Sequence, residues 1–162
     1  QLWPERQGVH NDQDEFLYAR LHRPAPRVRE GIALRGLASS AIDISDGLAA
    51  DLGHILVASR LGAPIELTAI PLSDAFRTQL RNISTTQSRK EWVNLAICSG
   101  DDYELCFTLP EPNRAALDRA MALCNGDYTV IGKIVETGRL QWRDADGSEI
   151  ILPCNGYNHF AG

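Results

Sequence analysis

The sequence predicts an α/β (α+β) domain, in which a mixed β-sheet of about six strands packs with three or four helices. Three observations lead to this fold class. Short apolar segments alternate along the chain with longer segments whose apolar residues recur every three or four positions. Glycine and proline residues separate most of these segments. Two of the short segments flank Asp146-Gly147, which is typical of a β-hairpin and therefore indicates a mixed sheet.

The first element is an N-terminal arm or interdomain linker over residues 1–35, which precedes an α/β domain over residues 36–162. The start of the arm is polar and unpatterned, and residues 20–35 hold five arginines against one acid. Pro24 and Pro26 exclude a helix interior around them, because proline lacks an amide donor and restricts the residue before it. The arm is compatible with a solvated linker and with a basic binding patch.

The domain begins with a strand, a tight turn and a helix. Ile42 and Ile44 alternate with Asp43 and Ser45, which is the pattern of a short strand with one apolar and one polar face. Apolar residues then recur at helical spacing over residues 48–60, which predicts an amphipathic helix closed by a glycine. The polar face of the strand therefore ends next to the start of a helix.

The remaining segments continue this alternation. Apolar runs predict further strands at 65–70, 104–109, 128–135, 140–143 and 149–152. Helical spacing predicts further helices at 71–80, 91–98 and 112–124. Between the first two of these helices, polar residues predict a loop at 82–87.

Composition excludes several function classes. The 162 residues include 16 Lys and Arg against 21 Asp and Glu, a net charge of −5, so the chain lacks the basic field that drives nucleic-acid binding. No apolar run approaches the ~20 residues that span a bilayer, so we expect no membrane partner. The first residues have neither the basic head nor the apolar stretch of a signal peptide, and we expect a cytoplasmic location.

Several common catalytic motifs are absent from the sequence. It contains no Walker-type G-x-x-x-x-G-K-[ST], no H-E-x-x-H, no G-x-G-x-x-G and no G-x-S-x-G. Residues 43–47 resemble the start of a calcium loop, but the glycine comes one place too early and His54 stands where a bidentate Glu is needed. Two acidic turns remain as candidate sites.

The first acidic turn combines Asp43, Ser45 and Asp46 between the strand and the following helix. Magnesium favours oxygen ligands, typically one or two carboxylates completed by water and phosphate oxygens. The helix N-terminus adds free amides and partial positive charge, which suit a phosphate. From the residues alone, the alternatives are that Asp46 caps the helix and that Asp43 is an ordinary exposed strand residue.

The second acidic turn holds Asp101, Asp102 and Glu104 within four positions. Such crowding is costly unless cations, backbone amides or solvent compensate it, so a solvated turn and a ligand site are both open. The C-terminal tail adds Tyr157 and Phe160, aromatic residues that are expected to pack or to bind a ligand.

Four segments together resemble the second half of the thiamine-monophosphate kinase family. They are LHRPAPR at 21–27, AIDISDGL at 41–48, SGDDYEL at 99–105 and GYNHF at 156–160. They occur in the same order as in that family, which belongs to the aminoimidazole ribonucleotide synthetase superfamily. The family commonly reads GGEDYEL at the second turn, where this chain has Ser99 and Asp101 in place of the first Gly and the Glu.

The resemblance implies the C-terminal domain of an aminoimidazole ribonucleotide synthetase-like fold. It also implies a kinase that uses ATP and Mg²⁺ to phosphorylate thiamine monophosphate to thiamine diphosphate. Carried over position by position, Asp43 and Asp46 bind magnesium, Ser45 contacts ATP, and Asp101 and Tyr157 contact the thiamine phosphate. These roles agree with phosphoryl transfer, which depends on positioning and on neutralising phosphate charge.

The resemblance also implies that these residues are a domain fragment. The family's N-terminal domain supplies further metal ligands, nucleotide contacts and a homodimer interface, so we expect the isolated fragment to be inactive. Two alternatives stay open: another ATP-using member of the superfamily, and a noncatalytic magnesium-nucleotide binding module.

Overall fold

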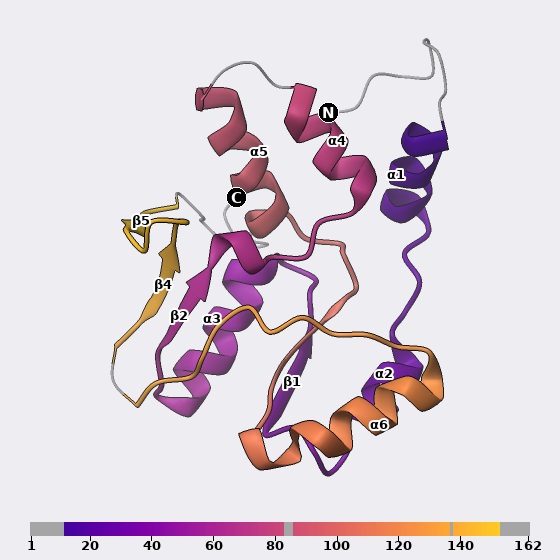
Figure 1. The fold of residues 1–162 in the computed structure, drawn as a ribbon, viewed down its shortest axis with the longest axis vertical. Coiled ribbons are helices and arrows are strands. Elements are labelled where there is room, and N and C mark those ends of the chain that lie inside the picture. Colours follow the sequence, from indigo (N-terminus) through magenta and orange to yellow (C-terminus); the bar gives the residue numbers. More distant parts are fainter. Residues whose placement is uncertain (1–11, 83–85, 137, 153–162) are drawn as a thin grey trace, which may run out of the picture.

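The computed structural model describes residues 12–82, 86–136 and 138–152 (Figure 1). Its helices are α1 (Asp12–His22), α2 (Val28–Ala33), α3 (Leu48–Ser59), α4 (Asp74–Asn82), α5 (Thr86–Cys98) and α6 (Arg114–Cys124). Two short 3₁₀ helices are η1 (Leu67–Ala69) and η2 (Glu111–Asn113). Its strands are β1 (Ser40–Asp43), β2 (Ala63–Glu66), β3 (Leu105–Thr108), β4 (Leu140–Arg143) and β5 (Glu149–Ile150).

The predicted mixed α/β class is confirmed, but the described residues form five strands and not six. The strands make two sheets. In one, β1 pairs antiparallel with β3. In the other, β2 pairs parallel with β4, and β4 pairs antiparallel with β5 through the hairpin expected around Asp146-Gly147.

The missing strand is the one expected at 128–135, and a proline explains its absence. Gly62 and Val135 exchange both backbone hydrogen bonds at 2.9 Å, as in an antiparallel ladder. At the next hydrogen-bonded position of this ladder, the amide of Lys133 donates to the carbonyl of Pro64 at 3.4 Å, but Pro64 has no amide to donate in return. The segment therefore makes only isolated bridges with the edge of β2.

Four helices, α3 to α6, lie in the region predicted as the domain, as expected. Their bounds differ from the sequence expectations mainly at α5, which begins at Thr86 rather than at residue 91. Two helices in the arm, α1 and α2, were not expected. They flank residues 23–27, which form no helix, as the two prolines predict.

Helix α3 lies between the two sheets and organises the larger core. Its apolar face packs with residues of β2, β3, β4 and α5; the buried members are Ile44, Leu48, Ala49, Leu52, Ile55, Leu56, Ala63, Ile65, Ile70, Ile97, Cys106 and Trp142. A second cluster of Leu34, Leu117 and Met121 joins α2 to α6, which lie together at the lower end of Figure 1. Each fully buried Leu or Ile contributes about 1.5–3 kcal/mol to folding.

Candidate functional site

The first acidic turn (residues 43–47) joins β1 to α3. Asp43 is the last residue of β1 and is exposed, whereas the following Ile44 is buried, so the predicted alternation holds. Ser45 and Asp46 are half-buried, and Gly47 leads into α3 with a φ of 102°. This glycine is needed because a φ of that value is strained for a residue with a side chain.

The second acidic turn (residues 99–104) lies directly against the first, although the two are more than fifty residues apart in the sequence. Ile44 donates its amide hydrogen to the carbonyl of Glu104 at 2.8 Å and accepts one from Tyr103 at 3.0 Å. The amide of Asp101 donates to the carbonyl of Ser45 at 2.9 Å. The structure therefore brings Ser45 and Asp101, both predicted site residues, into direct backbone contact.

Two glycines allow this close approach. A Cβ at Gly100 would lie 1.9 Å from the carbonyl oxygen of Ser45, and a Cβ at Gly47 would lie 2.8 Å from the backbone carbon of Cys98. Real Cβ atoms do not come this close to backbone atoms. Each turn therefore contributes one glycine to a contact of backbone on backbone.

The second turn adopts left-handed backbone at two residues that are not glycine. Asp101 has a φ of 65° and Tyr103 a φ of 51°. Such conformations cost roughly 1–3 kcal/mol each and persist only where the surroundings enforce them. Here the amides of the same two residues donate to the first turn, so the pairing of the turns holds the strained backbone.

A buried acid on α3 supports the first turn from behind. Asp51 is 2% exposed, and its Oδ2 accepts hydrogen bonds from the amides of Ser45 at 3.0 Å and Asp46 at 3.1 Å. Asp46, Asp51 and His54 each offer one atom that could bind a metal, and these three atoms lie within 4.8 Å of one another. Asp51 and His54 were not predicted as site residues from the sequence. Their i, i+3 spacing, on the helix that follows Asp46, was the available sign.

This cluster fits a divalent cation by its donor chemistry. The carboxylate of Asp46 offers the hard oxygen ligands that magnesium prefers, and the nearby carboxylate of Asp51 repels it unless a cation lies near them. Asp43 is not a member of the cluster, which is the one group of three or more such ligands that the described part of the chain brings together.

The acids of the second turn are electrostatically crowded, as the sequence predicts. The pKa of Asp102 is raised to about 6: partial burial of its carboxyl is the largest cause, the charges of Glu104 and Asp101 add to it, and Arg20 opposes it. The residue as a whole is exposed, so solvent screening limits the energetic weight of this shift.

Arginines of the arm neutralise Glu104. Arg27 donates to both carboxylate oxygens, from Nε to Oε2 at 2.8 Å and from Nη2 to Oε1 at 2.7 Å, and Arg20 forms an ion pair with the same carboxylate. Burial acts to raise the pKa of Glu104, but the hydrogen bonds and charges of the two arginines outweigh it and the net pKa is lowered. The arm is thus tied to the second acidic turn.

We expect Glu104→Gln to lower the free energy of unfolding by about 1 kcal/mol at pH 7, because the forked Arg27 pair is partly exposed. Since the folded pKa of Glu104 lies below its ordinary value of 4.5, this stabilisation is complete above pH 4.5 and is lost as the pH falls through the folded pKa. Urea unfolding at pH 7 and pH 3 measures the difference.

The matched control for this ion pair is Glu111→Gln. Glu111 forms a longer pair with Arg114, at 3.8 Å, and its side chain is 83% exposed. We expect no measurable destabilisation there. An equal loss in both variants, or a Glu104 effect that does not shrink at low pH, contradicts the role given to the arm.

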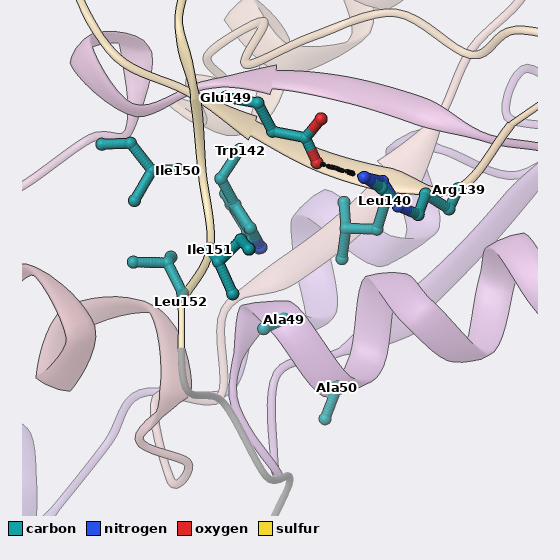
Figure 2. Close-up of a pocket in the computed structure, with 9 residues that line it drawn as sticks. All are labelled: Ala49, Ala50, Arg139, Leu140, Trp142, Glu149, Ile150, Ile151 and Leu152. Carbon is teal, nitrogen blue, oxygen red and sulfur yellow. Dashed lines mark hydrogen bonds and ion pairs between the residues drawn. The ribbon is translucent and has the colours of Figure 1, made fainter.

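A groove of about 370 Å³ lies beside the site but does not contain the acidic turns. Figure 2 shows its lining, which comes from the first turn of α3 and from the β4–β5 hairpin with the residues that follow it. The lining is largely apolar and includes Trp142 and the ion pair of Arg139 and Glu149, at 2.7 Å. It offers no cluster of carboxylates, so the acidic turns remain the candidate cation site.

Of the predicted site residues, Tyr157 lies outside the described residues. Asp101 is exposed in the second turn, and Ser45 and Asp46 are half-buried in the first. Asp43 is exposed at the end of β1. The described part of the chain contains no helix that is long and apolar enough to cross a membrane.

The chain is similar to known proteins along most of its length. Residues 11–144 match the family described as AIR synthase related protein, C-terminal domain. Thiamine-monophosphate kinase of Escherichia coli K12 is 45% identical over 147 residues, which cover 91% of this chain. The kinase of the same name from Pyrococcus horikoshii is 33% identical over 139 residues. The chain spans about 43% of the length of its curated relatives from Escherichia coli and Salmonella typhimurium.

Solved structures of proteins with this name are also similar to this chain. Thiamine-monophosphate kinase from Stenotrophomonas maltophilia superposes with a TM-score of 0.73 at 35% identity, covering 89% of this chain and 42% of that one. AaThiL complexed with AMPPCP and TMP superposes with a TM-score of 0.74 at 25% identity, covering 95% of this chain and 44% of that one. Escherichia coli HypE, at 16% identity and a TM-score of 0.59, shares the fold.

Proposed function

The chain belongs to the AIR synthase related protein, C-terminal domain family, and from this premise we propose that it is the C-terminal part of a thiamine-monophosphate kinase. The proposed reaction transfers the γ-phosphoryl group of ATP to thiamine monophosphate and yields thiamine diphosphate. The relatives that bear this name, and the AaThiL complex with AMPPCP, an ATP analogue, and TMP, support the proposal. The observation that carries it is the pairing of the two acidic turns, because these are the segments that resemble the kinase motifs.

Within this proposal, the first acidic turn holds the cation and the nucleotide. Asp46 and Asp43 bind Mg²⁺, which when bound neutralises the charge of the polyphosphate. Ser45 contacts ATP, next to the N-terminal amides of α3, which favour a phosphate. Asp51 holds the backbone of this turn in place.

The second acidic turn and the tail bind the acceptor substrate. Asp101 and Tyr157 contact thiamine monophosphate. Because Asp101 is tied to the backbone of Ser45, the acceptor is held beside the nucleotide, and such positioning is the main task in phosphoryl transfer. Residues beyond those of this chain complete the cleft, since the chain spans about 43% of the length of its relatives. The complete enzyme is proposed to be a cytoplasmic homodimer.

The function is tested by incubating the complete protein with ATP, Mg²⁺ and thiamine monophosphate and following thiamine diphosphate by ³¹P NMR. We expect product to form only with all three present, and EDTA to abolish it. We expect the isolated 162-residue chain to form none. ATP turnover that does not require thiamine monophosphate indicates another member of the superfamily, and nucleotide binding without turnover indicates a binding module.

In the same assay, Tyr157→Ala separates the acceptor side from the nucleotide side. We expect the KM for thiamine monophosphate to rise roughly tenfold, the effect of one lost polar or ring contact, while the KM for ATP stays unchanged. A rise confined to the KM for ATP contradicts the place given to the tail.

A further inference from the structure

Asp51 is the one buried charged residue in the described part of the chain. Burying a carboxylate is costly unless its oxygens are hydrogen-bonded. At Asp51 the amides of Ser45 and Asp46 and the positive end of α3 offset that cost. The side chain therefore reaches back past the start of its own helix to the backbone of the first acidic turn.

Holding this turn does not by itself require a negative charge. The side-chain oxygen of an asparagine accepts the same two hydrogen bonds with a smaller desolvation cost. The charge of Asp51 also lies within 4.8 Å of a ligand oxygen of Asp46, where it repels that carboxylate. A cation bound near Asp46 explains why a carboxylate occupies this position. The cation attracts the Asp51 charge, so the net electrostatic interaction of Asp51 with the site becomes favourable.

We propose that Asp51 is a positioning residue for Asp46. Its hydrogen bonds fix the main chain from which the Asp46 side chain projects, and its charge strengthens the binding of a divalent cation by Asp46. This inference rests on the proposed function in one respect, namely that Asp46 is a cation ligand.

The test is the affinity of the complete protein for Mn²⁺ alone, measured by electron paramagnetic resonance of the free ion. Binding that Asp46→Asn removes defines the site. We expect Asp51→Asn to weaken this binding roughly tenfold, the order of magnitude for removing one nearby charge in a solvated site. The hydrogen bonds to Ser45 and Asp46 can persist in this variant, so the turn keeps its shape.

The matched control is Asp118→Asn. Asp118 is an exposed acid of α6 that also accepts a hydrogen bond, from Tyr128. We expect its replacement to leave Mn²⁺ affinity unchanged. Affinity that is equally weakened in both variants, or unchanged in Asp51→Asn, overturns the proposal.

One measurement needs no variant and so holds even if Asp51→Asn fails to fold. Amide hydrogen exchange of the unsubstituted protein without any metal is expected to show protected amides at Ser45 and Asp46, since both donate to Asp51. Fast exchange at both positions overturns the proposal. None of these measurements uses thiamine monophosphate or ATP, so an absence of kinase turnover is a separate result that bears only on the proposed function.

Discussion

Asp46→Asn is expected to lower kcat of the complete protein about 100-fold, with its fold intact. Asp46 is half-buried beside Asp51, and asparagine has nearly the same size but lacks the negative charge of the proposed cation ligand. In the proposed reaction, loss of this cation ligand removes part of the neutralisation of phosphate charge that phosphoryl transfer needs. Initial rates at saturating ATP and thiamine monophosphate measure the effect.

Two comparisons make the Asp46 result specific. Raising the Mg²⁺ concentration is expected to restore part of the lost rate, because the defect lies in cation affinity. The control Asp118→Asn removes the same charge from α6 and is expected to keep full activity. If Asp46→Asn and Asp43→Asn both turn over at the unsubstituted rate, the magnesium assignment is wrong.

Gly100→Ala is expected to cost about 3 kcal/mol of unfolding free energy and to abolish activity. The new Cβ would lie 1.9 Å from the carbonyl oxygen of Ser45 and 2.8 Å from its carbonyl carbon, and neither atom belongs to a flexible side chain. The two acidic turns must therefore separate, which breaks the backbone hydrogen bonds that join them. Urea unfolding followed by circular dichroism measures the loss.

Gly53→Ala is the matched control for this substitution. Gly53 lies inside α3, and a Cβ built on it meets no atom within 4 Å. Alanine is the better helix former, so this variant is expected to gain up to ~1 kcal/mol. A Gly100→Ala protein as stable as the unsubstituted chain contradicts the close contact of the turns.

The elements read most reliably from the sequence are those with a complete local pattern. The alternation of Ile42 and Ile44 with polar residues and the helical spacing after residue 47 both describe elements that form as predicted. The expected closing glycine is wrong, because Arg60 adopts the left-handed conformation at the end of α3. The hairpin at Asp146-Gly147 is likewise formed, because its turn residues act locally. Local patterns were sufficient to predict secondary structure where the conformation of a segment is decided mainly by its own residues.

The expectations that failed depend on a partner segment. Residues 128–135 have the composition of a strand, but the ladder is interrupted by Pro64 on the neighbouring strand. Helix α1 has no pronounced apolar face, and it lies against α4. The arginines of the arm were compatible with solvent or with a binding patch, and two of them are paired with Glu104.

By itself, the sequence determined the α/β class, the family resemblance and the residue types of both acidic turns, since short contiguous motifs carry all three. Only the tertiary structure decided that these turns form one unit, that Gly47 and Gly100 let their backbones touch, and that a buried Asp51 holds the first turn from behind. The physical reason is that hydrogen bonds, steric contact and charge interactions between distant segments depend on distance in space, which spacing along the chain does not encode.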